Sequence, residues 1–194
     1  MRAALRFVKE GGAEAVKVEG GRTRLSLIRK MVENGIPVMG HIGLTPQSVL
    51  AMGGYKLQGK TLAAARGIID DARSLAQAGA FAIVLEVIPS ALARLVTREI
   101  KIPTIGIGAG PDVDGQVLVM NDLLGLTFGH TARFVRRYAD LRSAMSDAIS
   151  RYAEDVRNSR YPGAQESYDV SQEVAQQLER QEEQDDASYV LFSQ

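Results

Sequence analysis

The sequence of 194 residues contains no cysteine and only two histidines. The lack of cysteine excludes disulfide bridges, thiolate metal sites and a cysteine nucleophile, and it fits a reducing compartment. No apolar stretch approaches the length of about 20 residues that a membrane-spanning helix needs, and the first residues lack the apolar core of a secretory signal. We therefore predict a cytoplasmic protein with no membrane partner.

An excess of charge of either sign is also missing, since 23 Lys and Arg residues balance 23 Asp and Glu residues. Nucleic-acid-binding domains typically carry a basic excess, so we predict no nucleic-acid partner. The balance hides an asymmetry, because residues 164–194 contain eight acidic residues and one base, which leaves 22 basic and 15 acidic residues before them. That positive excess fits either an anionic substrate or an ordinary solvated surface.

Short apolar runs alternate with stretches of helical periodicity along the chain. The apolar runs have the length and composition of strands buried on both faces, as in a parallel sheet. They comprise residues 15–19, 37–40, 81–86, 103–107 and 116–120. Helical patterns cover residues 2–9, 22–33, 61–78, 90–100 and 133–157. This alternation predicts an α/β fold, either a (β/α)8 barrel or a doubly wound sheet.

Polar residues and glycines stand at the ends of several predicted strands. In a barrel the carboxyl ends of all strands surround one mouth, so these residues would line a single site, and we favour the barrel. Five strands cannot close a ring of eight. We therefore predict that residues 1–163 form an incomplete TIM barrel with about five strands, truncated at its N-terminus. We expect the acidic, Gln-rich tail, residues 164–194, to be disordered or a loose helix.

Residues 54–61, GYKLQGKT, match the pattern of a nucleotide-binding P-loop. A P-loop needs a buried strand that delivers its glycine-rich turn to the start of a helix. Here the preceding segment opens with Thr45-Pro46, which is typical of a helix start with proline in its first position. We therefore predict a short helix over residues 45–53 and reject nucleotide binding.

Lys17 and Glu19 alternate at the end of the first predicted strand, so their side chains point to the same side. A lysine can hold a substrate carboxylate, and a glutamate is a hard oxygen ligand for Mg²⁺. The alternative is an internal ion pair between the two side chains. Glu86 ends the most apolar strand, where it could act as a general base or could cap the following helix.

Two histidines and one glycine-rich loop complete the candidates. His41 follows Gly40 at a predicted strand end and is either a structural residue or part of the site. His130 is predicted to be a loop residue. Residues 106–110, GIGAG, resemble either a phosphate-binding loop or a tight turn that needs glycine.

Several of these segments, taken in order, resemble the ketopantoate hydroxymethyltransferase (3-methyl-2-oxobutanoate hydroxymethyltransferase) family. The matching segments are VKVEGG at 16–21, GIPVMGHIGLTPQSV at 35–49, GGYKLQGKT at 53–61, VLEVIP at 84–89, IPTIGIGAG at 102–110, DGQVLVMNDLLGL at 114–126 and FVRRYADL at 134–141. The resemblance covers nearly everything up to Gly163. Within that family GGYKLQGK is a hallmark, which gives a second reason to reject nucleotide binding.

The resemblance implies a TIM barrel of the phosphoenolpyruvate/pyruvate type, assembled as a homo-oligomer, often a decamer. It implies Mg²⁺ as the cofactor and a step of pantothenate and coenzyme A biosynthesis. In that step 5,10-methylenetetrahydrofolate donates a one-carbon unit to 3-methyl-2-oxobutanoate, which gives 2-dehydropantoate. Carried over to this chain, the resemblance implies that Lys17 binds the 2-oxo acid, Glu19 belongs to the Mg²⁺ site, and Glu86 accepts the proton.

The sequence departs from the family at its start. Family members begin with three further βα units, whose strand ends supply two Mg²⁺-binding aspartates and a substrate-binding serine. We expect activity to need these units, from upstream sequence or in trans, because Asp112, Asp114 and Asp122 do not occupy equivalent positions. Two alternatives are a non-catalytic subunit of the same family and another 2-oxo acid lyase or mutase.

Overall fold

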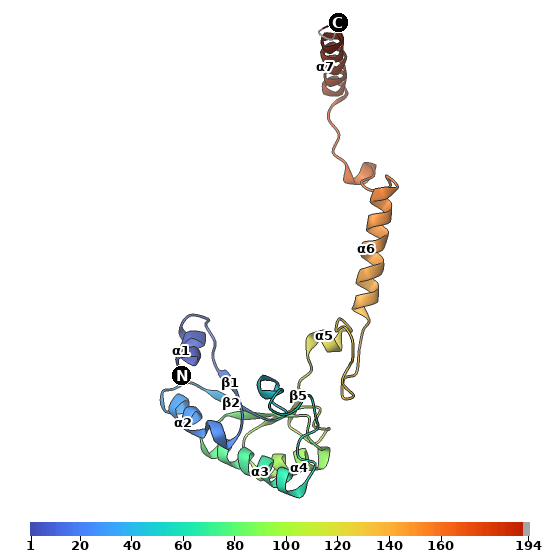
Figure 1. Ribbon diagram of the computed structural model, residues 1–194. Helices are drawn as coiled ribbons and strands as arrows, with labels where there is room; N and C mark the ends of the chain where they lie inside the picture. Colours follow the sequence, from blue (N-terminus) through green and yellow to red (C-terminus); the bar gives the residue numbers. More distant parts are fainter. Residues whose placement is uncertain (192–194) are drawn as a thin grey trace. The chain divides into compact units, whose positions relative to one another are not determined.

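The computed structural model describes the backbone of residues 1–191 and the side chains of residues 1–182 (Figure 1). It contains two compact units, Met1–Asp140 and the residues from Leu141 onward. The elements of the first unit are α1 (Arg2–Lys9), β1 (Val16–Glu19), η1 (Arg22–Arg24), α2 (Leu25–Glu33), β2 (Val38–Gly43), η2 (Pro46–Ser48), α3 (Leu62–Gln77), β3 (Ala82–Glu86), α4 (Ser90–Glu99), β4 (Thr104–Ile107), β5 (Gly115–Gln116) and α5 (Met120–Leu123).

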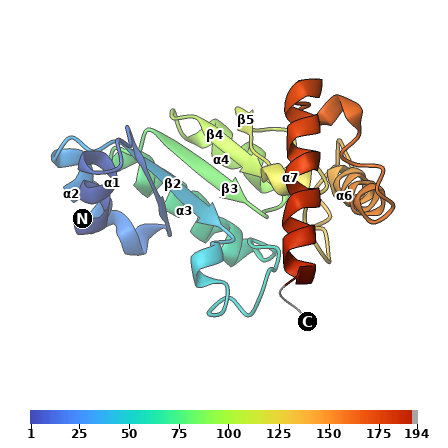
Figure 2. The same ribbon diagram turned by 90° about the horizontal axis from the view of Figure 1, so that it is seen from above.

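The five strands form one sheet in chain order, β1-β2-β3-β4-β5, and every neighbouring pair is parallel. Figure 2 shows β2, β3, β4 and β5 following one another across the first unit. Helices connect the first four strands, as in the wall of a (β/α)8 barrel. The prediction of an α/β fold with an incomplete barrel of five strands is confirmed.

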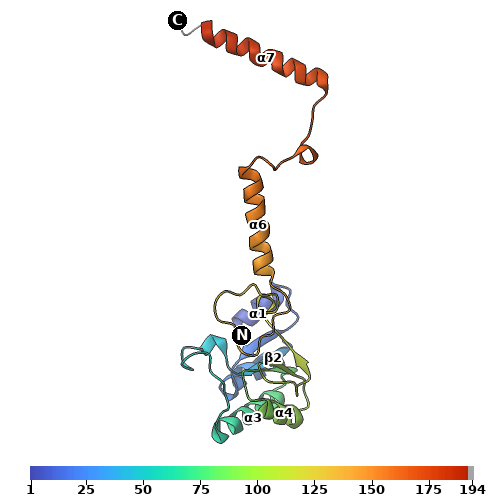
Figure 3. The same cartoon turned by 90° about the vertical axis from the view of Figure 1, so that its right-hand side faces the viewer.

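One face of the sheet packs against helices. Helices α3 and α4 lie together on that face in Figures 1 and 3, and α2 contributes Ile28 to the same core. Fully buried apolar side chains fill the space between sheet and helices. They are Ile28, Val38, Leu75, Ile83, Leu85 and Val96. Burial stabilises the fold by about 1.5–3 kcal/mol for each such side chain, so this face anchors the strands that carry the site.

Strand β2 is longer than predicted. The prediction ended it at residue 40, but it extends over Val38–Gly43 and therefore includes His41. Its last residue, Gly43, has φ +92, a conformation that glycine adopts without steric cost. The strand consequently ends where the backbone turns at Gly43, and His41 is a buried residue within the strand, two positions before its end.

Strand β5 is shorter than predicted and begins one residue earlier. It covers only Gly115–Gln116, and its last ladder bond runs from Val117 N–H to the Gly106 carbonyl. Residues 117–119 are irregular, and Met120 opens the short helix α5. The prediction of a buried strand over 116–120 was wrong because β5 lies at the sheet edge, where apolar residues such as Val119 stay exposed.

The helix predicted over residues 133–157 begins only at Leu141. The eight residues before it are irregular, because they bind other parts of the first unit. The ring of Phe134 packs against Gly108, and the Tyr138 N–H donates to the Leu123 carbonyl at 2.8 Å. The apolar periodicity of this segment thus reflects tertiary packing and not a helix.

Two further helical predictions were partly correct. The helix predicted over 22–33 consists of η1 followed by α2. The short helix predicted over 45–53 is a single 3-10 turn, η2, with Thr45 as its N-cap residue and Pro46 in first position. No strand precedes Gly54 within residues 44–53, so the requirement for a P-loop is not met.

The second unit contains α6 (Leu141–Arg157), η3 (Ala164–Glu166) and α7 (Gln172–Leu191). Apolar side chains recur along one stripe of α6 and are exposed, among them Met145, Ile149 and Tyr152. The tail that was expected to be disordered or loosely helical thus contains the helix α7. None of the described helices is both long enough and apolar enough to cross a membrane.

Candidate active site

The carboxyl ends of β1, β2 and β3 bring four candidate residues onto one face of the sheet. In the parallel register Glu19 pairs with His41, and Gly43 pairs with Glu86. Because residues two apart on a strand share a face, Lys17, Glu19, His41 and Glu86 all lie on the same face. This is the face opposite the helices, which forms the interior of a closed barrel. The three predicted site residues are therefore together, with His41 between the two glutamates.

His41 is the centre of this cluster and is only 1 % exposed. Its Nε2 atom lies 3.0 Å from the Leu44 carbonyl oxygen and 3.1 Å from Glu86 Oε2. A carbonyl oxygen can only accept, so Nε2 carries a hydrogen and donates it to Leu44. The same N–H places positive partial charge next to the Glu86 carboxylate.

The other ring nitrogen of His41 is buried without a hydrogen-bond partner among the described residues. It faces Glu19 Oε1 at 3.8 Å, beyond hydrogen-bond distance. Buried polar atoms in folded proteins are almost always paired, and an unpaired one costs about 1–3 kcal/mol. The His41 ring thus has one nitrogen, on the side that faces Glu19, which forms no hydrogen bond within the described residues.

Glu19 is fixed by the segment that follows β2. Its Oε2 accepts a hydrogen bond from the Gln47 backbone N–H at 3.0 Å, and its side chain is 10 % exposed. Gln47 lies in the first turn of η2, where N–H groups have no partner within the helix. The carboxylate is thereby oriented with Oε1 toward His41.

Lys17 lies two residues before Glu19 and its side chain is exposed. It forms no ion pair with Glu19 within the described part of the chain, so the alternative of an internal ion pair is not observed. Its neighbours Val16 and Val18 point the other way and pack against the helix-side core. Lys17 therefore presents an ammonium group to the open face.

Glu86 does not cap the helix that follows it. The N-cap of α4 is Pro89, and no side chain caps that helix. The Glu86 side chain is 14 % exposed and lies beside His41. The geometry thus excludes the capping alternative and leaves a partly desolvated carboxylate at the sheet end.

The backbone after Glu86 is strained. Val87 has φ 49, in a region that β-branched residues rarely adopt. Two backbone hydrogen bonds of 2.9 Å hold it there, one from Val87 N–H to the Ile107 carbonyl and one from Gln58 N–H to the Val87 carbonyl. Strain of this kind persists only where the surroundings enforce it, and it is concentrated at functional sites.

The strand end of β2 approaches Glu86 closely. The Leu44 N–H donates to the Glu86 carbonyl at 2.8 Å, and a Cβ on Gly43 would lie 2.2 Å from that same carbonyl oxygen. Only glycine fits between the two strands here. Gly43 and Val87 were missed as site residues in the sequence, although VMGHIGL carries a glycine two residues after the histidine.

A cavity of about 440 Å³ adjoins Glu19. It is lined by the turn after β1, the end of β2, the loop 44–61 and the first part of α3, with Thr23, Thr45 and Gln58 among its polar groups. The P-loop-like string belongs to this loop. Thr61 is the N-cap of α3 and accepts from Ala64 N–H at 3.2 Å, so the string serves to start a helix.

The remaining candidates are accounted for by structure. His130 is an exposed loop residue, as predicted. Gly108 and Gly110 both have positive φ and are covered by the side chains of Phe134 and Ser90. The GIGAG loop is therefore a turn in which glycine allows other side chains to pack closely against the backbone, and these glycines do not form an open phosphate-binding loop.

The aspartates after β4 are engaged elsewhere. Asp114 Oδ2 accepts from the Thr104 N–H at 2.8 Å and from its hydroxyl at 2.9 Å. Asp112 lies 3.8 Å from Arg94. Among the described residues no group of three or more acidic or histidine side chains is arranged to hold a metal ion. Glu19 offers carboxylate oxygens of the kind that Mg²⁺ prefers, but the described residues contain no complete set of ligands around it.

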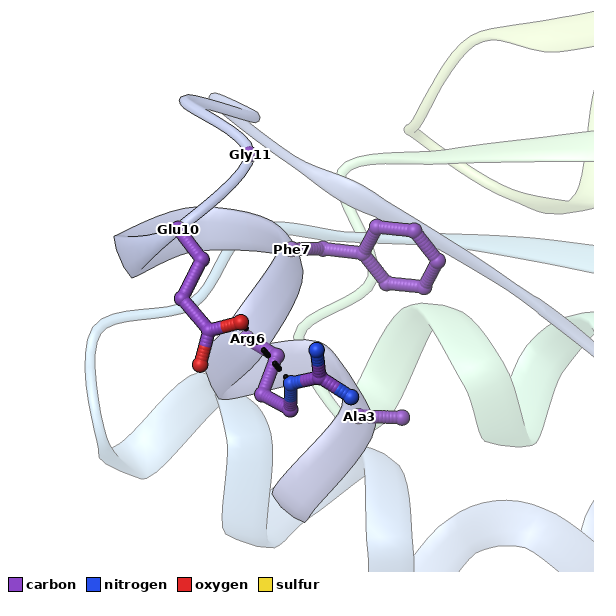
Figure 4. A pocket seen from close by; sticks show the side chains of 5 residues that line it. All are labelled: Ala3, Arg6, Phe7, Glu10 and Gly11. Carbon is purple, nitrogen blue, oxygen red and sulfur yellow. Dashed lines mark hydrogen bonds and ion pairs between the residues drawn. The ribbon is translucent and has the colours of Figure 1, made fainter.

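A further hollow of about 340 Å³ lies along α1. Figure 4 shows its lining, in which Arg6 and Glu10 face each other at 2.9 Å while the Phe7 ring points away from Glu10. Helix α1 leads into the amino end of β1. Since ligands of parallel α/β sheets bind at the carboxyl ends, this hollow is not the candidate site.

A profile of the family described as ketopantoate hydroxymethyltransferase matches residues 1–164. The chain belongs to the ketopantoate hydroxymethyltransferase family. The resemblance seen in the sequence is thus confirmed.

Curated relatives of this family are similar over most of the chain. The 3-methyl-2-oxobutanoate hydroxymethyltransferase of Koribacter versatilis is 52 % identical over 179 residues, which is 92 % of this chain and 61 % of the relative. The proteins of the same name from Carboxydothermus hydrogenoformans and Acidothermus cellulolyticus are 54 % and 56 % identical, over 63 % and 62 % of their lengths. The chain therefore spans about six tenths of these relatives.

Proposed function

We propose that the chain carries the proton-abstracting part of a 3-methyl-2-oxobutanoate hydroxymethyltransferase. The reaction transfers a one-carbon unit from 5,10-methylenetetrahydrofolate to 3-methyl-2-oxobutanoate and forms 2-dehydropantoate for pantothenate biosynthesis. The observation that carries the proposal is the shared face of Lys17, Glu19 and Glu86 at the carboxyl ends of adjacent parallel strands, in a chain of this family.

Lys17 is suited to hold the substrate. A 2-oxo acid is an anion, and the Lys17 ammonium group is exposed on the open face without an ion-pair partner in the described part of the chain. An ammonium group binds a carboxylate as a compact point charge with three donors. Lys17 would thus orient the substrate with its carboxylate toward β1 and its branched carbon toward β3.

Glu86 is suited to remove the proton from the branched carbon next to the keto group. Its carboxylate is partly desolvated and lies 3.1 Å from His41 Nε2, which fixes its orientation. The proton moves to Glu86, and the electron pair left on carbon forms an enolate. Water adds to the methylene carbon of the folate, and both bonds from that carbon to the two folate nitrogens break, which releases the one-carbon unit as formaldehyde and puts the two water hydrogens on the nitrogens. The enolate carbon then attacks the formaldehyde carbon and forms the new carbon–carbon bond, and the resulting alkoxide takes the proton back from Glu86 to become the hydroxyl group.

Magnesium fits this site in part. Glu19 offers one carboxylate oxygen, and Mg²⁺ is commonly bound by one or two carboxylates together with substrate oxygens and water. When bound, the ion supplies positive charge that stabilises an enolate beside a keto group. We propose that the further ligands are the two aspartates of the three βα units expected before β1, and that the complete protein is a cytoplasmic homo-oligomer.

Reconstitution tests this proposal. The chain would be co-expressed with the N-terminal segment of the Koribacter versatilis relative, and Mg²⁺-dependent formation of 2-dehydropantoate would be measured. We expect activity from the mixture, and a loss of about 100-fold or more in the Glu86→Gln variant, because a general base contributes about 10²–10⁴-fold. Glu99→Gln is the matched control, since Glu99 lies on α4 and pairs with Arg73 on α3.

A measurement without folate separates the removal of the proton from the transfer of the one-carbon unit. The reconstituted protein should exchange the proton on the branched carbon of 3-methyl-2-oxobutanoate with deuterium, as followed by NMR. Glu86→Gln should abolish the exchange and Glu99→Gln should not. Equal exchange in both variants would exclude Glu86 as the base.

A non-catalytic subunit is the second candidate function. The observation in its favour is that the described residues contain no complete metal site. A chain that folds stably alone, yet gives an inactive complex with every N-terminal segment tested, would support this candidate over the first.

A further inference from the structure

Asp71 on α3 binds the turn that follows β1. Its Oδ1 atom accepts a hydrogen bond from the Arg22 backbone N–H at 3.0 Å and another from the Arg22 Nε–H at 2.8 Å. The Asp71 side chain is 25 % exposed and lines the cavity of about 440 Å³ that adjoins Glu19. No local pattern in the sequence points to this contact, because 49 positions separate the two residues.

The bond replaces a helix cap that the local sequence lacks. The helical segment of η1 and α2 begins at Arg22, and its N-cap residue is Gly21, which has no side chain to accept a hydrogen bond. The first N–H groups of a helix have no partner within it, and a side-chain oxygen of the N-cap residue usually accepts one of them. Here a carboxylate from another helix accepts it, and its negative charge also suits the positive end of the helix dipole. The start of this helical segment therefore depends on α3.

Glycine at position 21 makes room for the carboxylate. A Cβ on Gly21 would lie 2.1 Å from Asp71 Cγ and 2.2 Å from Asp71 Oδ2. A side chain at this position would therefore push the carboxylate away from the Arg22 N–H. Gly21 and Asp71 thus belong to one arrangement.

The turn held by Asp71 positions Glu19. Only two glycines lie between Glu19 and Arg22, and glycine restricts the backbone less than any other residue. Two hydrogen bonds from neighbouring elements fix this connection. The Gly20 N–H donates to the His41 carbonyl on β2 at 2.9 Å, and the Arg22 N–H donates to Asp71 on α3. Without the second bond, the turn is held by β2 alone.

An exposed ion pair is the simpler interpretation of the same contact. Asp70, the preceding residue on α3, also lies 3.9 Å from Arg22 Nη1 and 3.6 Å from Arg73 Nη1, and its side chain is 49 % exposed. Ion pairs between exposed side chains contribute little to stability. The two neighbouring aspartates share the contact with the Arg22 side chain, but only Asp71 accepts the Arg22 backbone N–H. They are therefore a matched pair for an experiment.

We propose that Asp71 is a positioning residue, which holds the Arg22 N–H and thereby keeps Glu19 oriented for a metal ion. This inference rests on the proposed function, in which Glu19 is a ligand of Mg²⁺. Asp71 acts through the turn and takes no part in the proton transfer. Its loss should therefore weaken Mg²⁺ binding, while the rate of proton removal by Glu86 at saturating Mg²⁺ should stay close to that of the parent protein.

The test is the Mg²⁺ dependence of deuterium exchange on 3-methyl-2-oxobutanoate by the reconstituted protein. Asp71→Ala should raise the Mg²⁺ concentration for half-maximal exchange about threefold to tenfold, as expected for one lost hydrogen bond. Asp71→Asn, whose amide oxygen can still accept from the Arg22 N–H, should restore the parent value. Arg22→Gln removes the ion pair but keeps the backbone N–H, and it should match the parent. Asp70→Ala, which removes only exposed charge contacts, is the control.

Amide exchange measures the turn itself, without metal or substrate. In the complete 194-residue chain, followed by NMR in heavy water, the amide hydrogens of Gly20 and Arg22 should be protected to a similar degree, because one opening of the turn exposes both. Asp71→Ala should accelerate the exchange of the Gly20 amide about threefold to tenfold, and Asp70→Ala should not. The comparison of Gly20 with Arg22 in the parent chain needs no variant, so it remains a test even if Asp71→Ala does not fold.

The outcomes separate this inference from the proposed function. An unchanged Mg²⁺ dependence in Asp71→Ala, or the same loss of Mg²⁺ affinity in Arg22→Gln as in Asp71→Ala, would exclude the positioning role. In the parent chain, an Arg22 amide that is far less protected than the Gly20 amide would also overturn it. If the reconstituted parent protein catalyses no Mg²⁺-dependent exchange, the proposed function fails, whereas amide exchange in the chain still reports whether Asp71 holds the turn.

Discussion

His41 Nε2 lies 3.1 Å from Glu86 Oε2 while it donates its hydrogen bond to the Leu44 carbonyl. One buried N–H thus fixes both the backbone after β2 and the carboxylate at the end of β3. The ring also faces Glu19 with its other nitrogen. The side chain that joins the two glutamates is therefore the least exposed member of the site, and its replacement tests the whole arrangement.

We predict that His41→Gln is more stable than His41→Asn. The amide nitrogen of glutamine can occupy the position of Nε2 and keep the bond to Leu44, whereas that of asparagine falls near Nδ1. An unpaired buried carbonyl costs about 1–3 kcal/mol, so the free energies of unfolding in urea should differ by about that amount. Equal stability of the two variants would show that the Leu44 bond contributes nothing.

Gly43→Ala should be strongly destabilising, because a Cβ at this position would lie 2.2 Å from the Glu86 carbonyl oxygen. Gly35→Ala is the matched control, since Gly35 also has positive φ but has no atom within 4 Å of the added carbon. Both variants carry the conformational cost of about 1–2 kcal/mol. Urea unfolding should show a clearly larger loss of unfolding free energy for Gly43→Ala than for Gly35→Ala. Similar losses in the two variants would show that position 43 does not closely approach the Glu86 carbonyl.

Val87→Gly should cost less stability than an ordinary valine-to-glycine change. Glycine relieves the strain of φ 49 at this position, worth about 1–2 kcal/mol, and this offsets part of the lost side-chain packing and backbone entropy. Val16→Gly is the comparison, because Val16 is a partly buried residue of the extended strand β1. If thermal unfolding shows the same loss of stability for Val87→Gly and Val16→Gly, the backbone at Val87 is not strained.

Asp114→Ala should reduce the free energy of unfolding by about 1–3 kcal/mol, because Asp114 accepts two hydrogen bonds from the fully buried Thr104. Asp112→Ala should change it by less than about 1 kcal/mol, since its contact with Arg94 is exposed to water. Mg²⁺ binding should be the same in both variants and the parent chain. A change in Mg²⁺ affinity in the Asp114→Ala variant would instead place that aspartate in the site.

Much of the fold followed from the sequence, since apolar runs such as residues 81–86 correspond closely to β3 at Ala82–Glu86. The sequence also predicted that Glu19 and Glu86 lie at the same edge of the sheet, because parallel strands place their carboxyl ends at one edge. The central position of His41 did not follow. It depends on where β2 ends, which is set by the backbone turn at Gly43 and by contacts from Glu86 that no local pattern encodes.

The errors at β5 and before α6 have a common physical cause. Residues 116–120 and 133–140 are rich in apolar side chains, and a local pattern cannot tell whether these are buried by a regular element or by distant neighbours. Here Phe134 is placed by Gly108, which lies 26 positions earlier in the numbering. For that reason the contact between Phe134 and Gly108 could not be predicted from the sequence.

The hydrogen bond from Gln58 N–H to the Val87 carbonyl allows the opening of the turn after Glu86 to be measured by hydrogen exchange. Gln58 belongs to the string that superficially matches a nucleotide loop, and its amide hydrogen is protected only while the turn after Glu86 keeps its shape. The rate at which this single amide exchanges with heavy water therefore measures how often the turn after Glu86 opens, and the measurement needs no substrate.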